Sequence, residues 1–265
     1  MYPYEFIKDT GIDLYVVLII VGIAAALFTA RIISARFDIS ARLFNFTIIV
    51  GVVAIIGGWG AARLFQAYFN YLASGNFAFT GQTFYGGLIG GAATFLIVYF
   101  IGGHFVFKDK EHIRCFGEIV DLAAPCIVIA HAFGRLGCLT AGCCYGPVTD
   151  KWYGINMLSG GYWAKRVPTQ LIEALFLFAF FAVLVALIYK KRFRDTAAVY
   201  LVTYGIWRFF FEYLRADGER GSSGIAFLTP SQLIAILLVL TGVAWYFVYK
   251  YFLKERMKNV GKVKE

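Results

Sequence analysis

Residues 14–30 read LYVVLIIVGIAAALFTA, a run of seventeen residues without a charged side chain. A helix needs about 20 mainly apolar residues to cross a bilayer, and this run is close to that length. Six further stretches of similar character follow it along the chain. They lie at 47–70, 84–103, 117–137, 170–189, 196–215 and 231–252. Together these stretches predict an all-α polytopic membrane protein with seven transmembrane helices.

The composition supports the same class of protein. The chain has 265 residues, of which 60% are hydrophobic and 15% charged, and its mean hydropathy is +0.70. These values lie far outside those of soluble proteins. Because the seven stretches use most of the chain, we expect residues 1–265 to form a single integral-membrane domain. The flank at 2–13 is acidic and no small-residue cleavage site follows, which favours a retained first helix over a signal peptide.

The basic residues fall on one predicted side of the membrane. They are concentrated in the connections after the first, third and fifth stretches and in the tail, whereas residues 71–83 hold no Lys or Arg. The positive-inside rule therefore places the N-terminus outside and the C-terminus in the cytoplasm. An anionic inner leaflet accounts for the net charge of +9, so no nucleic acid partner is expected.

The connection at 138–169 is the longest irregular segment. It is rich in Gly, Tyr and Trp and has no long apolar run. It also carries Lys151, Lys165 and Arg166, which depart mildly from the positive-inside pattern. Because the segment is long, these charges are diluted along it. We interpret it as an outer-face loop or small cap, with room for short strands, between the fourth and fifth helices. Residues 216–230 form a second predicted outer loop.

Three arginines lie within the apolar stretches: Arg63, Arg135 and Arg208. A charge at bilayer depth costs at least about 2.5–3.5 kcal/mol, so it normally faces a polar cavity or an anionic partner. The predicted orientation puts all three in the outer half of the membrane. Arginine binds phosphate through paired hydrogen bonds, which favours an anionic phospholipid site facing the outer leaflet. Two alternatives stay open: Arg63 snorkels to the interface, or Arg208 is neutralised by Glu212.

Other polar residues converge on the same half of the membrane. On the sixth stretch, four of them are spaced 4, 4 and 3 apart and share one helical face. They are Tyr204, Arg208, Glu212 and Arg215. The outer ends of other stretches contribute Tyr15, Thr83, Tyr85, Thr169, Gln170, Glu173, Ser231 and Gln232. His131, one turn before Arg135, is either a structural residue or a general base or phosphate contact. Asp121, about 21 Å from Arg135 along the helix, is expected to be structural.

Two short patterns allow several interpretations. The glycines of GGLIGG at 86–91 permit the close approach of another helix or of a lipid headgroup. Cys138, Cys143 and Cys144 are packing residues, the source of an outer-face disulfide, or a thiolate or metal site. We expect no metal and no cofactor, because the CxxxxCC pattern provides fewer ligands than a metal site needs.

Several motifs resemble those of the prolipoprotein diacylglyceryl transferase family. They are FYGGLIGG at 84–91, GRLGCLTAGCCYG at 134–146, PTQLIEA at 168–174 and YGIWRFFFEYLR at 204–215. Weaker matches are Tyr15, GAARLF at 60–65, DLAAP at 121–125 and LTPSQ at 228–232. The motifs follow the family's order through the whole chain, so the resemblance is specific.

The resemblance implies a membrane-embedded phospholipid:protein diacylglyceryl transferase. It would be a multi-pass protein of the bacterial plasma (inner) membrane, with its active site facing the outer leaflet. Such enzymes transfer the diacylglyceryl group of phosphatidylglycerol to the cysteine thiol of a prolipoprotein, forming a thioether and releasing glycerol phosphate. The expected partners are therefore phosphatidylglycerol or a related anionic phospholipid and a prolipoprotein signal peptide.

The resemblance and the residue positions together assign roles. The expected catalytic residues are Arg135, Arg208, Tyr85, His131 and Glu212. The expected substrate-binding residues are Tyr15, Arg63, Gly86, Gly87, Gly146, Tyr204, Cys138 and Cys143. In this interpretation Arg135 and Arg208 stabilise the departing phosphate, and Glu212 orients Arg208.

The chain departs from the family pattern at three positions. Tyr85 stands where the well-studied branch has a His implicated in catalysis, and Cys138 and Cys143 stand where it has Asn and Glu. Tyrosine, with an ordinary pKa near 10, is a poor base, so His131 is the candidate to supply an imidazole. These differences leave another acceptor or another lipid donor as an alternative.

Two classes of protein other than a transferase compete less well. A lipid transporter is expected to have polar residues at the midplane and inverted repeats, and the sequence shows neither pattern. A membrane thiol oxidoreductase is expected to have a CxxC pair, which the sequence lacks.

Overall fold

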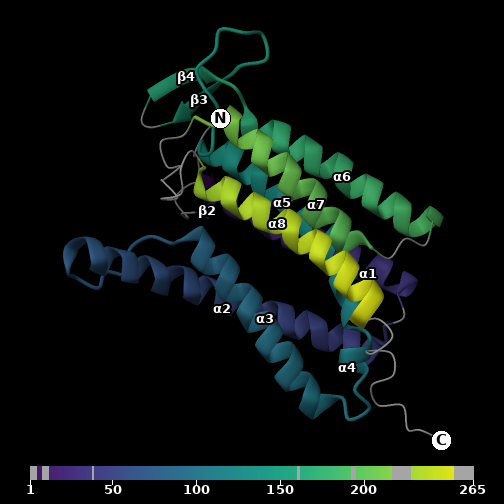
Figure 1. The fold of residues 1–265 in the computed structure, drawn as a ribbon. Coiled ribbons are helices and arrows are strands. Elements are labelled where there is room, and N and C mark those ends of the chain that lie inside the picture. Colours follow the sequence, from purple (N-terminus) through teal and green to yellow (C-terminus); the bar gives the residue numbers. More distant parts are fainter. Residues whose placement is uncertain are drawn as a thin grey trace, which may run out of the picture. The chain divides into compact units, whose positions relative to one another are not determined.

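The computed structural model describes residues 5–7, 12–37, 39–159, 162–191, 195–216 and 228–253. This part of the chain is mostly helical (Figure 1). It falls into two compact units. Among the described residues, the first unit lies within 5–37 and 120–253, and the second within 39–119.

Helices make up most of the first unit. Its α-helices are α1 (Leu14–Ile33), α5 (Phe116–Ala141, which starts in the second unit), α6 (Thr169–Lys191), α7 (Thr196–Phe211) and α8 (Pro230–Val248). Shorter helical turns are η1 (Ser34–Arg36), η2 (Glu212–Leu214) and the π-helical η4 (Tyr249–Leu253). Its strands form two antiparallel pairs, β1 (Glu5–Ile7) with β2 (Ile12–Asp13) and β3 (Ile155–Ser159) with β4 (Tyr162–Arg166).

Helices are found at all seven predicted stretches. Within the described residues, six are long and apolar enough to cross a membrane. They are α1, α5, α6 and α8 of the first unit with α2 (Ala41–Ser74) and α3 (Phe84–Val106) of the second. The seventh, α7, has 16 residues and falls short of that length. A polytopic all-α fold is therefore confirmed, while the count of seven spans and the orientation of the termini stay predictions.

Asp121 fixes the start of α7 to α5. Its buried carboxylate Oδ1 accepts a hydrogen bond from the backbone N–H of Ala197 at 2.9 Å. The hydroxyl of Thr196 donates to the backbone carbonyl of Asp121 at 2.6 Å. The bond from Ala197 satisfies a backbone N–H in the first turn of α7, which has no intrahelical partner. The expectation that Asp121 is structural is confirmed.

The predicted short strands of the 138–169 connection are present as the β3–β4 hairpin. The turn before this hairpin forms backbone hydrogen bonds with the segment after β4 and with the segment after η2. Gly146 N–H donates to the carbonyl of Val167, just beyond β4, and Ala216 N–H donates to the carbonyl of Tyr145, both at 3.0 Å. The hairpin and the end of η2 therefore hold the loop that follows α5, and the placement of this cap on the outer face stays a prediction.

The second unit is built on α2 and α3, which pack against each other, and on the short α4 (Glu111–Arg114). The glycines of residues 86–91 face α2 at very short range. A Cβ built on Gly90 would collide with the Cβ of Ala61, and one on Gly86 would lie 2.7 Å from the Cβ of Phe65. Helix packing therefore accounts for these glycines.

This packing gives a prediction for Gly90. Replacing it with alanine is expected to destabilise the protein by about 1–3 kcal/mol, because the helices must move apart to accept one methyl group. The measurement is thermal unfolding in detergent, with Gly51→Ala as control because a Cβ there would meet nothing within 4 Å. Combining Gly90→Ala with Ala61→Gly should restore stability. Equal stability of the Gly90 and Gly51 variants would contradict this packing.

Candidate functional site

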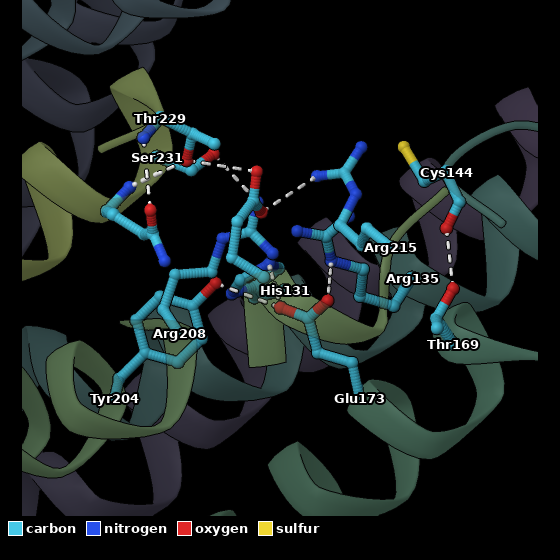
Figure 2. A network of polar contacts seen from close by, with 12 residues as sticks. His131, Arg135, Cys144, Thr169, Glu173, Tyr204, Arg208, Arg215, Thr229 and Ser231 are labelled. Carbon is cyan, nitrogen blue, oxygen red and sulfur yellow. Dashed lines mark hydrogen bonds and ion pairs between the residues drawn. The ribbon is translucent and has the colours of Figure 1, made fainter. Parts of the chain in front are cut away.

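The carboxylate of Glu173 in α6 is almost completely buried in the first unit and gathers three side chains. Arg135 of α5 forms an ion pair with it, with Nε 2.9 Å from Oε2. The hydroxyl of Tyr204 on α7 donates to Oε1 at 3.0 Å, and Nε2 of His131 lies 3.9 Å from the same oxygen. Figure 2 shows these side chains pointing toward Glu173 from different helices. Glu173 thus links α5, α6 and α7 at one point.

A second buried carboxylate, that of Glu212 in η2, forms an ion pair with Arg208. The Nη2 atom of Arg208 lies 2.8 Å from Oε2 of Glu212 and also donates to the hydroxyl of Ser231 at 2.9 Å. The hydroxyl of Thr229 donates to the other oxygen of Glu212 at 3.2 Å. Nη1 of Arg215 lies 4.0 Å from Oε2 (Figure 2). One nitrogen of the Arg208 guanidinium, Nη2, is therefore held by side chains of two elements, η2 and α8.

The four-residue spacing of the network residues along α5 and α7 places their side chains on shared helix faces. His131 and Arg135 are four residues apart on α5, and so are Tyr204 and Arg208 on α7, so each pair lies on one face. The α8 N-terminus brings Thr229, whose hydroxyl also caps that helix in a reciprocal capping box with Gln232. The apolar cluster of Val128, Ala132, Leu177, Phe180, Leu184 and Tyr204 packs α5, α6 and α7 together beside the network.

Among the described residues, the network brings more guanidinium groups than carboxylates together. Three guanidinium groups, of Arg135, Arg208 and Arg215, interact with two carboxylates. The Nη1 atom of Arg208 is buried and has no hydrogen-bond partner among the described residues. Leaving a buried donor unpaired costs about 1–3 kcal/mol, more for a charged group. Within the described part of the chain, the arrangement therefore offers one buried guanidinium donor, Nη1 of Arg208, to an anionic ligand.

Three cysteines form a second cluster in the first unit. Cys138 lies in the last turn of α5, and Cys143 and Cys144 follow in the next turn of chain. Their sulfur atoms all lie within 4.8 Å of one another, and all three are free thiols of intermediate exposure. Hydrogen bonds from the thiols of Cys138 and Cys143 hold the pKa of Cys144 well below its usual range, and the charges of Arg215 and Arg135 act in the same direction. This cluster therefore lies within electrostatic reach of the arginine network.

The other predicted site residues are placed as follows. Tyr15 packs against the last turns of α5, where a Cβ on Gly137 would lie 3.0 Å from its ring. Gly146 lies against Val167 and Leu214. In the second unit, Nη2 of Arg63 donates to the carbonyl of Phe79 at 2.9 Å, and Gly86 and Gly87 face α2. The side chain of Tyr85 lies outside the described part of the structure. The convergence of polar side chains from all seven helices stays a prediction.

Glu173 is the residue whose importance the sequence did not reveal. It was among the polar residues at the outer ends of the predicted helices, but nothing in its own motif assigned it a role. Its partners come from positions up to 42 residues before it and 31 residues after it. A signal was nevertheless present, since a carboxylate inside an apolar stretch requires a partner of opposite charge.

Comparison with known proteins agrees with the motifs. The family model described as prolipoprotein diacylglyceryl transferase matches residues 5–248. The chain is 32% identical over 217 residues to phosphatidylglycerol–prolipoprotein diacylglyceryl transferase 2 of Clostridium perfringens, with 79% of each chain covered. It is 30% identical to the corresponding transferase of Pseudomonas paraeruginosa over 242 residues, covering 87% of this chain and 86% of the relative. The family match and both relatives span most of the chain, and the protein therefore belongs to the prolipoprotein diacylglyceryl transferase family.

Proposed function

We propose that this protein transfers the diacylglyceryl group of phosphatidylglycerol to the cysteine thiol of a prolipoprotein. The observation that carries the proposal is the arginine network, in which Arg208 is held by Glu212 and Ser231 while its buried Nη1 has no hydrogen-bond partner among the described residues. Relatives that match most of the chain are named as phosphatidylglycerol–prolipoprotein diacylglyceryl transferases, which supports the same donor and acceptor here.

The reaction exchanges one bond to carbon for another. The sulfur of the acceptor cysteine attacks the glyceryl carbon that carries the phosphate ester. A C–S bond forms, the C–O bond to phosphate breaks, and its electron pair leaves with glycerol phosphate. Negative charge therefore grows on the departing phosphate, where arginine donors have their largest effect on rate.

The two carboxylates make this binding site rigid. Glu212 holds Arg208 and Glu173 holds Arg135, so each guanidinium presents its remaining N–H groups without reorganising. Tyr204 and His131 complete the contacts of Glu173. His131, between Glu173 and the ring of Tyr204, is also a group that can accept the proton of the acceptor thiol.

The proposed function also includes an orientation of the protein in the membrane. The basic connections and tail place the C-terminus in the cytoplasm by the positive-inside rule, and α7 then carries Arg208 toward the outer leaflet of a bacterial plasma membrane. Tyr15 and Gly146, which also belong to the first unit, complete the proposed contacts to the headgroup and the peptide.

The test is an assay of the purified protein with glycerol-labelled phosphatidylglycerol and a peptide that carries a prolipoprotein cysteine. The expected result is a thioether-linked peptide and released glycerol phosphate in equal amounts. The same peptide with serine in place of cysteine is the control and should yield neither product. Absence of both products with the cysteine peptide, while a related transferase is active alongside, would reject this acceptor.

A further inference from the structure

The three-cysteine cluster is not used by the function proposed above. Its sulfur atoms come from Cys138, at the end of α5, and from the adjacent Cys143 and Cys144, and they converge within 4.8 Å. None of the three is fully buried, so a ligand can reach the cluster. Their pattern has too few ligands for a closed site with four protein donors. An open metal site, by contrast, uses three protein ligands and keeps the fourth position for water or substrate.

The chain fixes the turn that carries two of the sulfurs. Cys143 N–H donates to the carbonyl of Cys138 at 3.2 Å, and Cys144 has a positive φ of 58°. The first turn of α6 holds both cysteine carbonyls, since Thr169 donates to that of Cys144 at 2.7 Å and Gln170 donates to that of Cys143. The cysteines are therefore held together by the backbone, without a disulfide.

The spacing of the sulfurs suits a tetrahedral zinc ion. Zinc–sulfur bonds of about 2.3 Å in a tetrahedron put neighbouring sulfurs about 3.8 Å apart. Sulfurs within 4.8 Å of one another reach that arrangement with side-chain movements of less than an ångström or so. Three thiolates with one Zn²⁺ carry a net negative charge. Arg215 and Arg135, whose charges act on Cys144, compensate it. In Figure 2 the Cys144 sulfur lies on the side of the guanidinium of Arg215.

We propose that Cys138, Cys143 and Cys144 bind one zinc ion, and that the acceptor cysteine of the prolipoprotein takes its fourth coordination position. This inference rests on the proposed function, because it supplies the thiol activation that the transfer needs. A thiol that coordinates zinc is deprotonated on binding. Its proton passes to solvent, its sulfur keeps the electron pair, and the attack on the glyceryl carbon follows as described above. The zinc ion stays Zn²⁺ and keeps its three protein ligands.

The proposal also accounts for the residues that depart from the family. The tyrosine at position 85 is a poor base, and Cys138 and Cys143 occupy two of the other departing positions. In this proposal the metal ion, and not a basic side chain at position 85, favours the thiolate form of the acceptor cysteine.

The first experiment measures the metal content of the full chain, purified in detergent with a non-chelating reductant. Elemental analysis is expected to find one zinc ion per chain. Cys138→Ser, Cys143→Ser and Cys144→Ser should each lower zinc affinity by at least about 10–100-fold. Cys126→Ser is the matched control and should keep the metal, because the thiol of Cys126 donates to the carbonyl of Leu122 one turn away. A wild-type chain without zinc that also fails to bind added zinc would overturn the proposal. So would a mass two hydrogens lower than expected in protein purified without reductant, which reveals a disulfide.

The second experiment uses the wild-type protein alone, so it does not depend on the folding of any variant. Co²⁺ loaded in place of Zn²⁺ should give the thiolate-to-cobalt charge-transfer and tetrahedral d–d absorption bands. Adding the prolipoprotein cysteine peptide should change these bands, and the serine peptide should not. Unchanged bands with the cysteine peptide would refute the fourth-ligand assignment.

The transfer assay separates the two proposals. Full activity of metal-free protein would overturn the zinc site and leave the transferase function standing. Zinc binding with a cobalt spectrum that responds to the cysteine peptide, but with no transfer from phosphatidylglycerol, would support the metal site and refute the proposed donor.

Discussion

Replacing Arg208 with alanine is expected to lower the rate of diacylglyceryl transfer by about 10²–10³-fold, the usual effect of removing one donor to a developing negative charge. Within the described part of the chain, the buried Nη1 of Arg208 has no hydrogen-bond partner, and the contacts of Arg208 to Glu212 and Ser231 hold it in place. The measurement is the initial rate of thioether formation at saturating phosphatidylglycerol, with folding checked by size-exclusion chromatography in detergent.

Two further variants sharpen this prediction. Arg208→Lys should also be slow, because an ammonium group cannot contact Glu212, Ser231 and a phosphate in the planar geometry of a guanidinium. Arg36→Ala is the matched control, since Arg36 is an exposed residue of η1 whose guanidinium stacks on Tyr189, 4.5 Å from the ring centre. A lysine variant with the wild-type rate would show that charge alone suffices and would contradict the geometric role of Arg208.

Replacing Glu173 with alanine is expected to destabilise the protein by about 3–5 kcal/mol and to abolish transfer. Its carboxylate is the ion-pair partner of Arg135, whose side chain is only 14% exposed. Removing one partner of a buried pair leaves an uncompensated charge, and this penalty dominates the loss. The hydroxyl of Tyr204 loses its acceptor in the same change. Denaturant unfolding followed by tryptophan fluorescence in detergent measures the effect.

The Glu173→Gln variant separates charge from hydrogen bonding. Its amide oxygen can still accept from Tyr204, so it should be more stable than the alanine variant while remaining poorly active. Asp150→Ala, which removes an exposed carboxylate of the first unit, is the control and should have wild-type stability. If Glu173→Ala were as stable as Asp150→Ala, the buried network would not be a stabilising element of the fold.

The sequence predicted the helices well because length and apolar content are local properties. All seven stretches contain a helix, and the strands of the 138–169 connection are present. Boundaries were less accurate. The stretch at 47–70 is part of a longer α2 that begins at Ala41, where Ser40 caps it by accepting from Leu43 N–H. The α-helix expected to continue through Arg215 ends at Phe211 and gives way to the 3₁₀ turn η2.

The site was harder to predict because its contacts join distant parts of the chain. The pairing of Arg208 with Glu212 follows from i,i+4 spacing on the sequence. The pairing of Arg135 with Glu173 does not, because it depends on how α5 packs against α6. Likewise, the CxxxxCC pattern gave no sign that the sulfur of Cys138 would meet those of Cys143 and Cys144. That meeting depends on a turn clamped by Thr169 and Gln170.

We propose that the guanidinium groups of Arg135 and Arg208 bind the phosphate of a lipid. The most direct measurement is a high-resolution structure of the protein in nanodiscs that contain phosphatidylglycerol. We predict a headgroup phosphate within hydrogen-bond distance of Arg208 Nη1, with Arg135 contacting the same phosphate and Glu173 and Glu212 still in place. A phosphatidylglycerol headgroup bound elsewhere, with both arginines contacting only carboxylates and water, would contradict it.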